Sequence, residues 1–379
     1  MKKIFYIGLV LLALFEIMNV YFIMPMPGSQ RMNSIDLAYF VYSYRWICRS
    51  IFSLMILAGA PFVFRSTKVW VPLLALIPVV VIAYFFNFKM TADHMFLQPD
   101  ELVFKSRSEN TLTDSSLVIA VTHHHEAKAY PVRYIQYHHQ VRDTIAGKPI
   151  MVTYCNVCRT GRVYEPTVNG KPENFRLVGM DHFNAMFEDE TTKSWWRQAT
   201  GEAITGSLKG NTLPEVESSQ LTLGKFFLFH PFGKVMAAEA SSKESYDTLG
   251  RFEKGKSKGK LTRTDTVSWS DKSWVVGIQV EKFAKAYDWN ELKTKRVIHD
   301  DIGSRPVVVA LASDDHSFVA FERNADERFF IRNDSLVSSL HKFDFAGRSR
   351  DGSGARLVKS YQEFWHSWKQ FHPQTEVYK

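Results

Sequence analysis

The chain has 379 residues, 45% hydrophobic and 23% charged, which is enough for a membrane region and one or two folded units. Its formal net charge of +8 comes from 47 basic and 39 acidic residues, without a block of basic residues interleaved with aromatic ones. Composition therefore gives no support to nucleic-acid binding. Three cysteines are too few for a disulfide framework.

Three apolar segments near the N-terminus predict a membrane region over residues 1–87. They are Ile4–Met24, Trp46–Phe64 and Val69–Phe86. Each is close to the length of roughly 20 residues that a spanning helix needs. A cleaved signal peptide would account for the first segment alone, so the two that follow favour three membrane-spanning helices.

Positive charges predict the orientation of this region. Lys2 and Lys3 precede the first segment, and Arg65 and Lys68 lie between the second and the third. Because cytoplasmic loops carry an excess of Lys and Arg, these ends are expected in the cytoplasm. The expected location is the inner, or cytoplasmic, membrane, with several passes and with the C-terminal region outside the cytoplasm, in the periplasm or at the cell surface. The lipid bilayer is thus the first expected partner.

One ionisable side chain, Glu16, lies inside the first apolar segment, where a charge is costly. Two interpretations stay open. Glu16 is a functional group that pairs with Arg49 or handles protons, or it is a neutral carboxyl that is hydrogen-bonded between helices. The neutral carboxyl is the simpler interpretation.

A repeated pattern organises the rest of the chain. The segment that starts at Ser116 aligns without a gap with the segment that starts at Ser273, 157 residues later. An FHP tripeptide closes each copy, at 229–231 and at 371–373. The sequence therefore predicts an α+β fold in which three N-terminal transmembrane helices precede a strand-rich ectodomain built from two similar halves by internal duplication.

The expected boundaries follow from this repeat. They are 1–87 for the membrane region, 88–115 for a linker, 116–249 for the first half, 250–272 for a basic loop, and 273–379 for the second half.

Alternating and β-branched residues predict strands within each copy. Leu117–Val121 and Ala127–Val132 indicate a hairpin around a His-rich turn, and Ile150–Tyr154 and Arg162–Tyr164 indicate further strands. Tyr361–Phe371 carries aromatic residues at helical spacing, which predicts that each copy ends in a helix.

The sharpest chemical signal is the pair of Cys155 and Cys158. Two thiolates three residues apart can chelate one soft metal ion or close a redox disulfide. A structural zinc site needs four ligands, and the sequence has no second CxxC, so histidines would have to complete the set. The candidate ligands are His138, His139 and His182.

Only the first copy carries these groups. The second copy has Ala312 and Asp315 at the positions of the two cysteines, and Lys295 at the position of His138. Glycine-rich phosphate loops and serine elbows are absent from the sequence. The candidate site therefore belongs to the first half, and the second half completes the fold.

Several motifs of the soluble part resemble one bacterial family. In chain order they are EAKAYPVRYIQYHHQVRDTIAGKPIMVTYCNVC, TKSWWRQATGEAITGSLKG and QEFWHSWKQFHPQTEVY. Over residues 115–379 the chain resembles the domain of unknown function 3179. The resemblance places His138, Asp143 and the two cysteines in the first family motif, and Trp196, Gln198 and Glu202 in the second. It implies that Asp143, Trp196, Gln198 and Glu202 are candidate pocket residues.

The chain departs from the family pattern beside His138, where the family has Glu and this chain has His139. The replacement of the family's Glu by His139 argues against a shared acid or base role at that position but suits metal ligation. The family has no settled activity, so the resemblance implies fold and membership rather than chemistry. Whether the chain is an enzyme stays open.

Three hypotheses for function follow. The leading one is a metal or redox site of Cys155, Cys158 and His138, with His182 or His139 as a fourth group and copper or zinc as the cofactor. The alternative is a non-catalytic envelope module that needs no cofactor, binds a partner protein or polymer, and uses a Cys155–Cys158 disulfide as a structural clip. The third, thiol–disulfide exchange, needs an exposed and activated cysteine.

Overall fold

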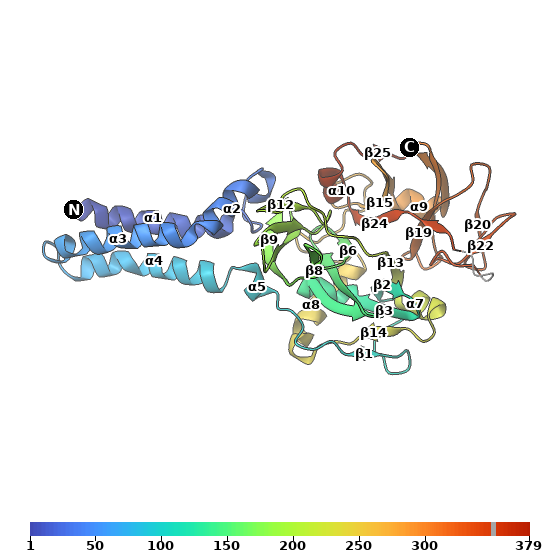
Figure 1. Ribbon diagram of the computed structural model, residues 1–379, viewed down its shortest axis with the longest axis horizontal. Coiled ribbons are helices and arrows are strands. Elements are labelled where there is room, and N and C mark those ends of the chain that lie inside the picture. Colours follow the sequence, from blue (N-terminus) through green and yellow to red (C-terminus); the bar gives the residue numbers. More distant parts are fainter. Residues whose placement is uncertain (350–353) are drawn as a thin grey trace. The chain divides into compact units, whose positions relative to one another are not determined.

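The computed structural model describes residues 1–349 and 354–379. It has mixed helix and strand content, with three long apolar helices at the N-terminus and a strand-rich region after them (Figure 1). The described chain divides into two compact units. Unit 1 consists of Met1–Leu97, Glu173–Arg197 and Glu202–Thr212, and unit 2 of Gln98–Pro172, Gln198–Gly201 and Leu213–Lys379. The predicted second half includes residues 350–353, which lie outside the described residues.

Three helices of unit 1 are long and apolar enough to span a membrane. They are α1 (Lys2–Tyr21), α3 (Arg45–Phe64) and α4 (Trp70–Phe88), and they lie side by side (Figure 1). Their ends differ from the predicted segments by at most three residues. Two shorter helices, η1 (Ser29–Arg31) and α2 (Ile35–Ser43), connect α1 to α3, and α5 (Ala92–Met95) follows α4.

A polar cluster ties the three long helices together. The Arg49 guanidinium on α3 makes two bonds of 2.7 Å to the two carboxylate oxygens of Glu16 on α1. Asn87 on α4 completes the cluster, because its Nδ2 donates to Glu16 Oε2 at 2.9 Å and its Oδ1 accepts from Arg49 at 2.6 Å. The Glu16 carboxyl therefore pairs with Arg49 and is hydrogen-bonded between helices, which are features of both interpretations.

A four-stranded antiparallel sheet from the middle of the chain also belongs to unit 1. Its strands, in the order β12-β11-β10-β9, are β12 (Ala203–Thr205), β11 (Trp195–Arg197), β10 (Asn184–Asp189) and β9 (Phe175–Asp181). Close backbone contact places it against the chain that leaves α1, since Met180 N donates to Ile23 O at 2.6 Å. A Cβ on Gly179, whose φ is 158°, would lie 2.2 Å from that same oxygen, so only glycine fits there.

Unit 2 contains the remaining strands. Up to residue 253 it holds β1 (Phe104–Lys105), β2 (Leu117–His123), β3 (Glu126–Pro131), α6 (Val132–His138), β4 (Gln140–Ile145), β5 (Lys148–Cys155), β6 (Thr160–Tyr164), β7 (Thr167–Val168), β8 (Lys171–Pro172), β13 (Ser218–Thr222), α7 (Leu223–Phe229), β14 (Lys234–Met236), η2 (Ala240–Ser242) and α8 (Lys243–Glu253). After that it holds β15 (Trp274–Val280), β16 (Phe283–Asp288), α9 (Trp289–Lys295), β17 (Val297–Ile302), β18 (Arg305–Leu311), β19 (Phe318–Glu322), β20 (Phe330–Arg332), β21 (Ser335–Val337), β22 (Lys342–Phe343), β23 (Arg356–Leu357), β24 (Lys359–Phe364), α10 (Trp365–Phe371) and β25 (Glu376–Val377).

The two parts of unit 2 repeat one order of strands. One sheet runs β13-β2-β3-β14 and then β1, and another runs β24-β15-β16-β25, with a parallel pair at β3-β14 and at β16-β25. The same ion pair follows each hairpin, since Lys128 Nζ lies 2.8 Å from Asp143 and Lys285 Nζ lies 2.7 Å from Asp300. The predicted hairpin around the His-rich turn is confirmed as β2 and β3.

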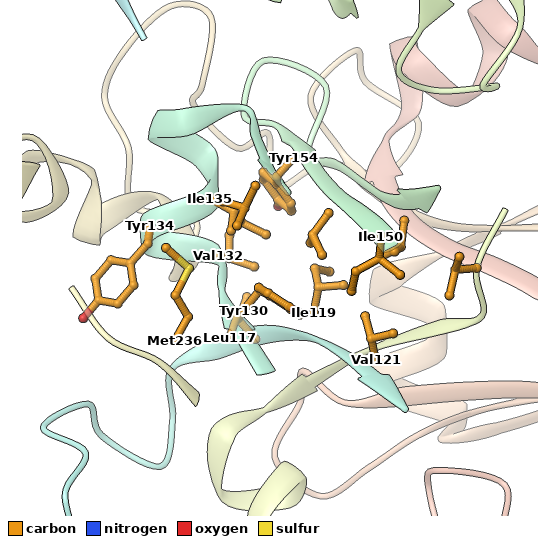
Figure 2. Packing of buried hydrophobic residues seen from close by; sticks show 14 of the residues in the cluster. Leu117, Ile119, Val121, Tyr130, Val132, Tyr134, Ile135, Ile150, Tyr154 and Met236 are labelled. Carbon is orange, nitrogen blue, oxygen red and sulfur yellow. The ribbon is translucent and has the colours of Figure 1, made fainter. Parts of the chain in front are cut away.

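Apolar residues from the alternating strands and from α6 fill the core of the first part of unit 2. Figure 2 shows labelled side chains of this cluster, among them Ile119 from β2, Ile135 from α6 and Ile150 from β5, pointing toward one another. A matching cluster around Val276, Tyr287 and Val309 fills the second part. Burial of this apolar area is the main favourable term that holds each part together.

The predicted helix Tyr361–Phe371 is half wrong. Its first residues belong to β24, which pairs with β15, and only Trp365–Phe371 form α10. Aromatic spacing could not separate the strand from the helix. Phe364 at the end of the strand and Trp368 on the helix are four residues apart, which is also the spacing of one helical turn. The short helices α6 and α9 were not predicted, and α8 occupies the beginning of the predicted basic loop.

Gly277 on β15 lies directly under the Trp368 ring. A Cβ at this position would lie 2.2 Å from the ring, and Trp368 is fully buried, so the indole cannot move aside freely. We expect Gly277→Ala to lower the free energy of unfolding by about 1–3 kcal/mol, as overpacked cores do. The thermal unfolding midpoint checks this, with Gly354→Ala as the control, because a Cβ on Gly354 would come no closer than 4.0 Å to a neighbouring atom. Equal midpoints for both variants would contradict the expected clash.

Candidate dithiol site

The hairpin of β5 and β6 positions Cys155 and Cys158. Cys155 ends β5 and pairs with Thr160 at the beginning of β6, and the intervening residues form a tight turn. Four residues of a turn bring their first and last Cα atoms within about 7 Å, which keeps Cys155 and Cys158 close together. Both cysteines are fully buried, and both are thiols.

The two sulfurs contact each other and a hydroxyl from α10. Cys158 is hydrogen-bonded to Cys155 and to Ser367. Burial, followed by the hydrogen bond and the charge of Cys155, raises the pKa of Cys158 well above its usual value, although Ser367 and Lys272 act against this shift. At neutral pH Cys158 is therefore protonated in the metal-free protein.

A lysine and a histidine lie against the loop between the cysteines. Lys272 Nζ donates to Val157 O at 2.5 Å and lies 3.0 Å from His366 Nε2. Burial lowers the pKa of Lys272, whereas the nearby cysteines raise it. Burial and the charge of Lys272 lower the pKa of His366 to about 3, so the imidazole is neutral; its Nε2 also lies 3.2 Å from Val157 O.

Buried ion pairs and hydrogen bonds fix the surrounding wall. Arg162 on β6 forms a salt bridge with Glu363 on β24, and Glu363 also accepts a hydrogen bond of 2.9 Å from Ser367. Arg159, in the turn at φ 56°, donates to Gln362 Oε1 at 2.9 Å. Because every one of these side chains is less than 3% exposed, the cysteine turn is held rigidly against β24 and α10.

Gln198 is the predicted pocket residue that lies at this hairpin. Its Nε2 donates to Thr153 Oγ1 and to Thr160 O, both at 3.0 Å, and so braces the strands on either side of the cysteine turn. Gln198 is fully buried and belongs to unit 2. Its role here is to position the hairpin.

The other predicted pocket residues lie elsewhere. Asp143 bonds to Lys128 and Tyr130 beside the first hairpin of unit 2. In unit 1, Trp196 Nε1 donates to Asp189 at 2.9 Å, and Glu202 lies 3.5 Å from Arg197. Within unit 2, Asp143 and Gln198 therefore belong to different hairpins.

The three predicted histidine ligands occupy different surroundings. His138 Nε2 lies 2.5 Å from the Tyr246 hydroxyl, and His139 ends α6 at φ 62° with its pKa lowered to about 4 by burial. His182 lies in unit 1, where its ring bonds Asp181 at 2.6 Å and Asn33 at 3.1 Å. Across the described residues, no group of three or more His, Cys, Asp or Glu side chains is arranged to hold a metal ion.

Sequence reasoning missed the partners of the cysteines. Lys272, His366 and Ser367 come from more than a hundred residues away along the chain. A signal for two of them existed, because His366 and Ser367 stand in the third motif that resembles the family.

What the fold and this site define is a strand-rich α+β chain with N-terminal apolar helices and a buried dithiol. The chain belongs to the family described as a protein of unknown function, DUF3179, whose family model matches residues 99–375. This confirms the family that the motifs indicated. No curated protein and no solved structure matches the chain.

Proposed function

We propose that the chain is a membrane-anchored protein whose region outside the cytoplasm binds one copper(I) ion between Cys155 and Cys158. The three long apolar helices support the anchor, and the positive charges at Lys2, Lys3, Arg65 and Lys68 support the orientation. The matching strand orders and ion pairs in unit 2 support an origin by internal duplication, with one dithiol in the first half.

The observation that carries the metal proposal is the half-buried ammonium of Lys272 beside two buried sulfurs. In the dithiol state this ammonium bonds to two neutral groups, the Val157 carbonyl and the His366 imidazole, and the carboxylates of Asp271 and Asp265 act on it electrostatically. A buried charge is stabilised when an opposite charge lies near it. A neutral disulfide would add no negative charge on the sulfur side of Lys272, whereas a metal dithiolate adds one there.

Charge and ligand number favour copper(I) over zinc. Binding follows the balance Cu⁺ + 2 RSH → [Cu(SR)₂]⁻ + 2 H⁺, and the single negative charge of the product matches the single positive charge of Lys272. Thiolates are soft ligands that select copper(I). A structural zinc ion needs four ligands, and the described residues gather only two thiols with one adjacent imidazole.

Burial of both sulfurs weighs against thiol–disulfide exchange. Exchange with another protein requires a thiolate that the partner can reach, and both Cys155 and Cys158 are 0% exposed. A single ion needs far less access than a protein thiol. Lys272 and His366, which lie against the loop between the cysteines, are only partly buried.

The test is copper loading of the full-length chain in detergent, without oxygen. We expect one copper(I) ion per chain, together with protection of both buried thiols from a thiol reagent after denaturation. No copper, with both thiols already joined, would overturn the proposal and favour the non-catalytic envelope module with its Cys155–Cys158 clip. No copper with two reactive thiols would overturn both readings.

Copper binding is expected to depend steeply on pH. The pKa of Cys158 is raised by burial, so this thiol carries its proton at neutral pH and must release it when copper binds. Binding is thus weak at low pH, and the affinity rises by about tenfold per pH unit for each proton released. Cys158 releases one proton, and the sulfur of Cys155 releases up to one more. Titration between pH 6 and pH 8 against a competing chelator measures the slope. An affinity independent of pH would contradict binding through thiolates.

A further inference from the structure

Helix α2 connects the first two long helices and has two different faces. Leu37, Phe40 and Tyr44 are 46%, 57% and 48% exposed, and their spacing places them on one side of the helix. Ala38 and Val41 are buried. A row of large exposed apolar side chains marks a surface that binds another protein or a membrane.

The other side of α2 holds the sheet of unit 1. The rings of Tyr39 and Tyr42 lie with their centroids 5.1 and 5.5 Å from that of Trp195 on β11. The Tyr42 hydroxyl also accepts a hydrogen bond from Arg176 on β9. The same guanidinium donates to a carboxylate oxygen of Asp93 at 3.1 Å. The sheet side of α2 is therefore already occupied.

We propose that the exposed face of α2 lies in the lipid headgroup region, so that the helix rests along the membrane surface and carries the sheet above it. Continuity supports this, because α3 begins at Arg45, directly after Tyr44. Trp46 on the first turn of α3 is 67% exposed, and Trp and Tyr side chains concentrate at membrane–water interfaces. Arg45, which lies over the Tyr42 ring at 3.8 Å, places a cation where lipid phosphates would meet it.

This inference rests on the proposed membrane anchoring, and spin-label accessibility in phospholipid vesicles tests the two separately. The background is the full-length chain with Cys48→Ser, whose remaining cysteines are buried and should take up no label under native conditions. Labels are then placed by Phe40→Cys on α2, by Leu54→Cys in the middle of α3, and by Phe232→Cys in unit 2. These positions are 57%, 64% and 96% exposed.

The expected result is that the label at 40 meets dissolved oxygen more readily than a water-soluble nickel chelate, at a depth between those of 54 and 232. A label at 40 that behaves like the one at 232 would place α2 in water and overturn the inference. A label shielded from both reagents would mean that protein, such as a second copy of the chain, covers the face, and would also overturn it. Water-like behaviour at 54 would overturn the anchoring itself.

Discussion

Replacing Cys158 with serine is expected to weaken copper(I) binding by about two to three orders of magnitude. A structural metal bound by four ligands contributes about 10–16 kcal/mol, so one ligand is worth roughly 2.5–4 kcal/mol, and each 1.4 kcal/mol is a factor of ten. Serine keeps the shape and the hydrogen bond to Ser367 but offers no soft donor. Cys155→Ser should have an effect of the same size. Competition with a copper(I) chelator at fixed pH measures both.

Two further variants distinguish the copper ligands from the residues around them. Cys48→Ser changes the third thiol, on α3, and should leave the affinity unaltered. Lys272→Met keeps both sulfurs but removes the neighbouring charge, and we expect a loss of about 10–100-fold, as for other residues that support metal ligands. Wild-type affinity in Cys158→Ser would show that copper binds elsewhere.

Replacing Arg49 with leucine is expected to destabilise the helical part of unit 1 by about 3 kcal/mol, because a charged side chain within a membrane costs this much when its partner is lost. Arg49 makes two bonds of 2.7 Å to Glu16, whose side chain is 3% exposed. The double variant Glu16→Leu with Arg49→Leu removes both charges and should unfold within about 1 kcal/mol of the wild type. Unfolding by a denaturing detergent measures Arg49→Leu, the single variant Glu16→Leu and the double variant as a double-mutant cycle.

The matched control is Arg65→Leu, at the exposed end of α3, which should leave the unfolding transition in place. Equal stability of Arg49→Leu and the wild type would mean that the Glu16 pair contributes nothing. A loss in the double variant equal to the sum of the losses in the two single variants would mean that the two charges act independently.

The three long helices could be predicted because the length of an apolar run is enough to indicate a membrane-spanning helix. The run Val69–Phe86 is uncharged, and α4 (Trp70–Phe88) follows it closely. The hairpin of β2 and β3 could likewise be predicted from alternation. The boundary inside Tyr361–Phe371 could not, since pairing of β24 with β15 decides where the strand stops, and that contact joins residues far apart in sequence.

The sheet of unit 1 shows a second limit of sequence reasoning. Residues 173–212 stand in the middle of the predicted first half, yet most of them form one compact unit with the long helices. Backbone contacts such as Met180 N to Ile23 O bring them there. A backbone hydrogen bond has no side-chain pattern, so the sequence carries no sign of it.

Only the centre of the candidate site could be predicted. Cys155 and Cys158 are close in sequence, and their chemistry is readable from spacing. Lys272 and His366 reach them through folding of the second part of unit 2 onto the hairpin, and an ammonium or imidazole a hundred residues away gives no local signal. The histidines beside α6 looked equally suitable, but folding placed His138 against Tyr246.

X-ray absorption at the copper edge of the loaded full-length chain tests the copper proposal most directly. The expected spectrum is that of monovalent copper with two sulfur neighbours, and the signal should be lost when Cys155 and Cys158 are both replaced by serine. Copper surrounded only by nitrogen and oxygen, or a spectrum that the double replacement leaves unchanged, would contradict a copper(I) site at this dithiol.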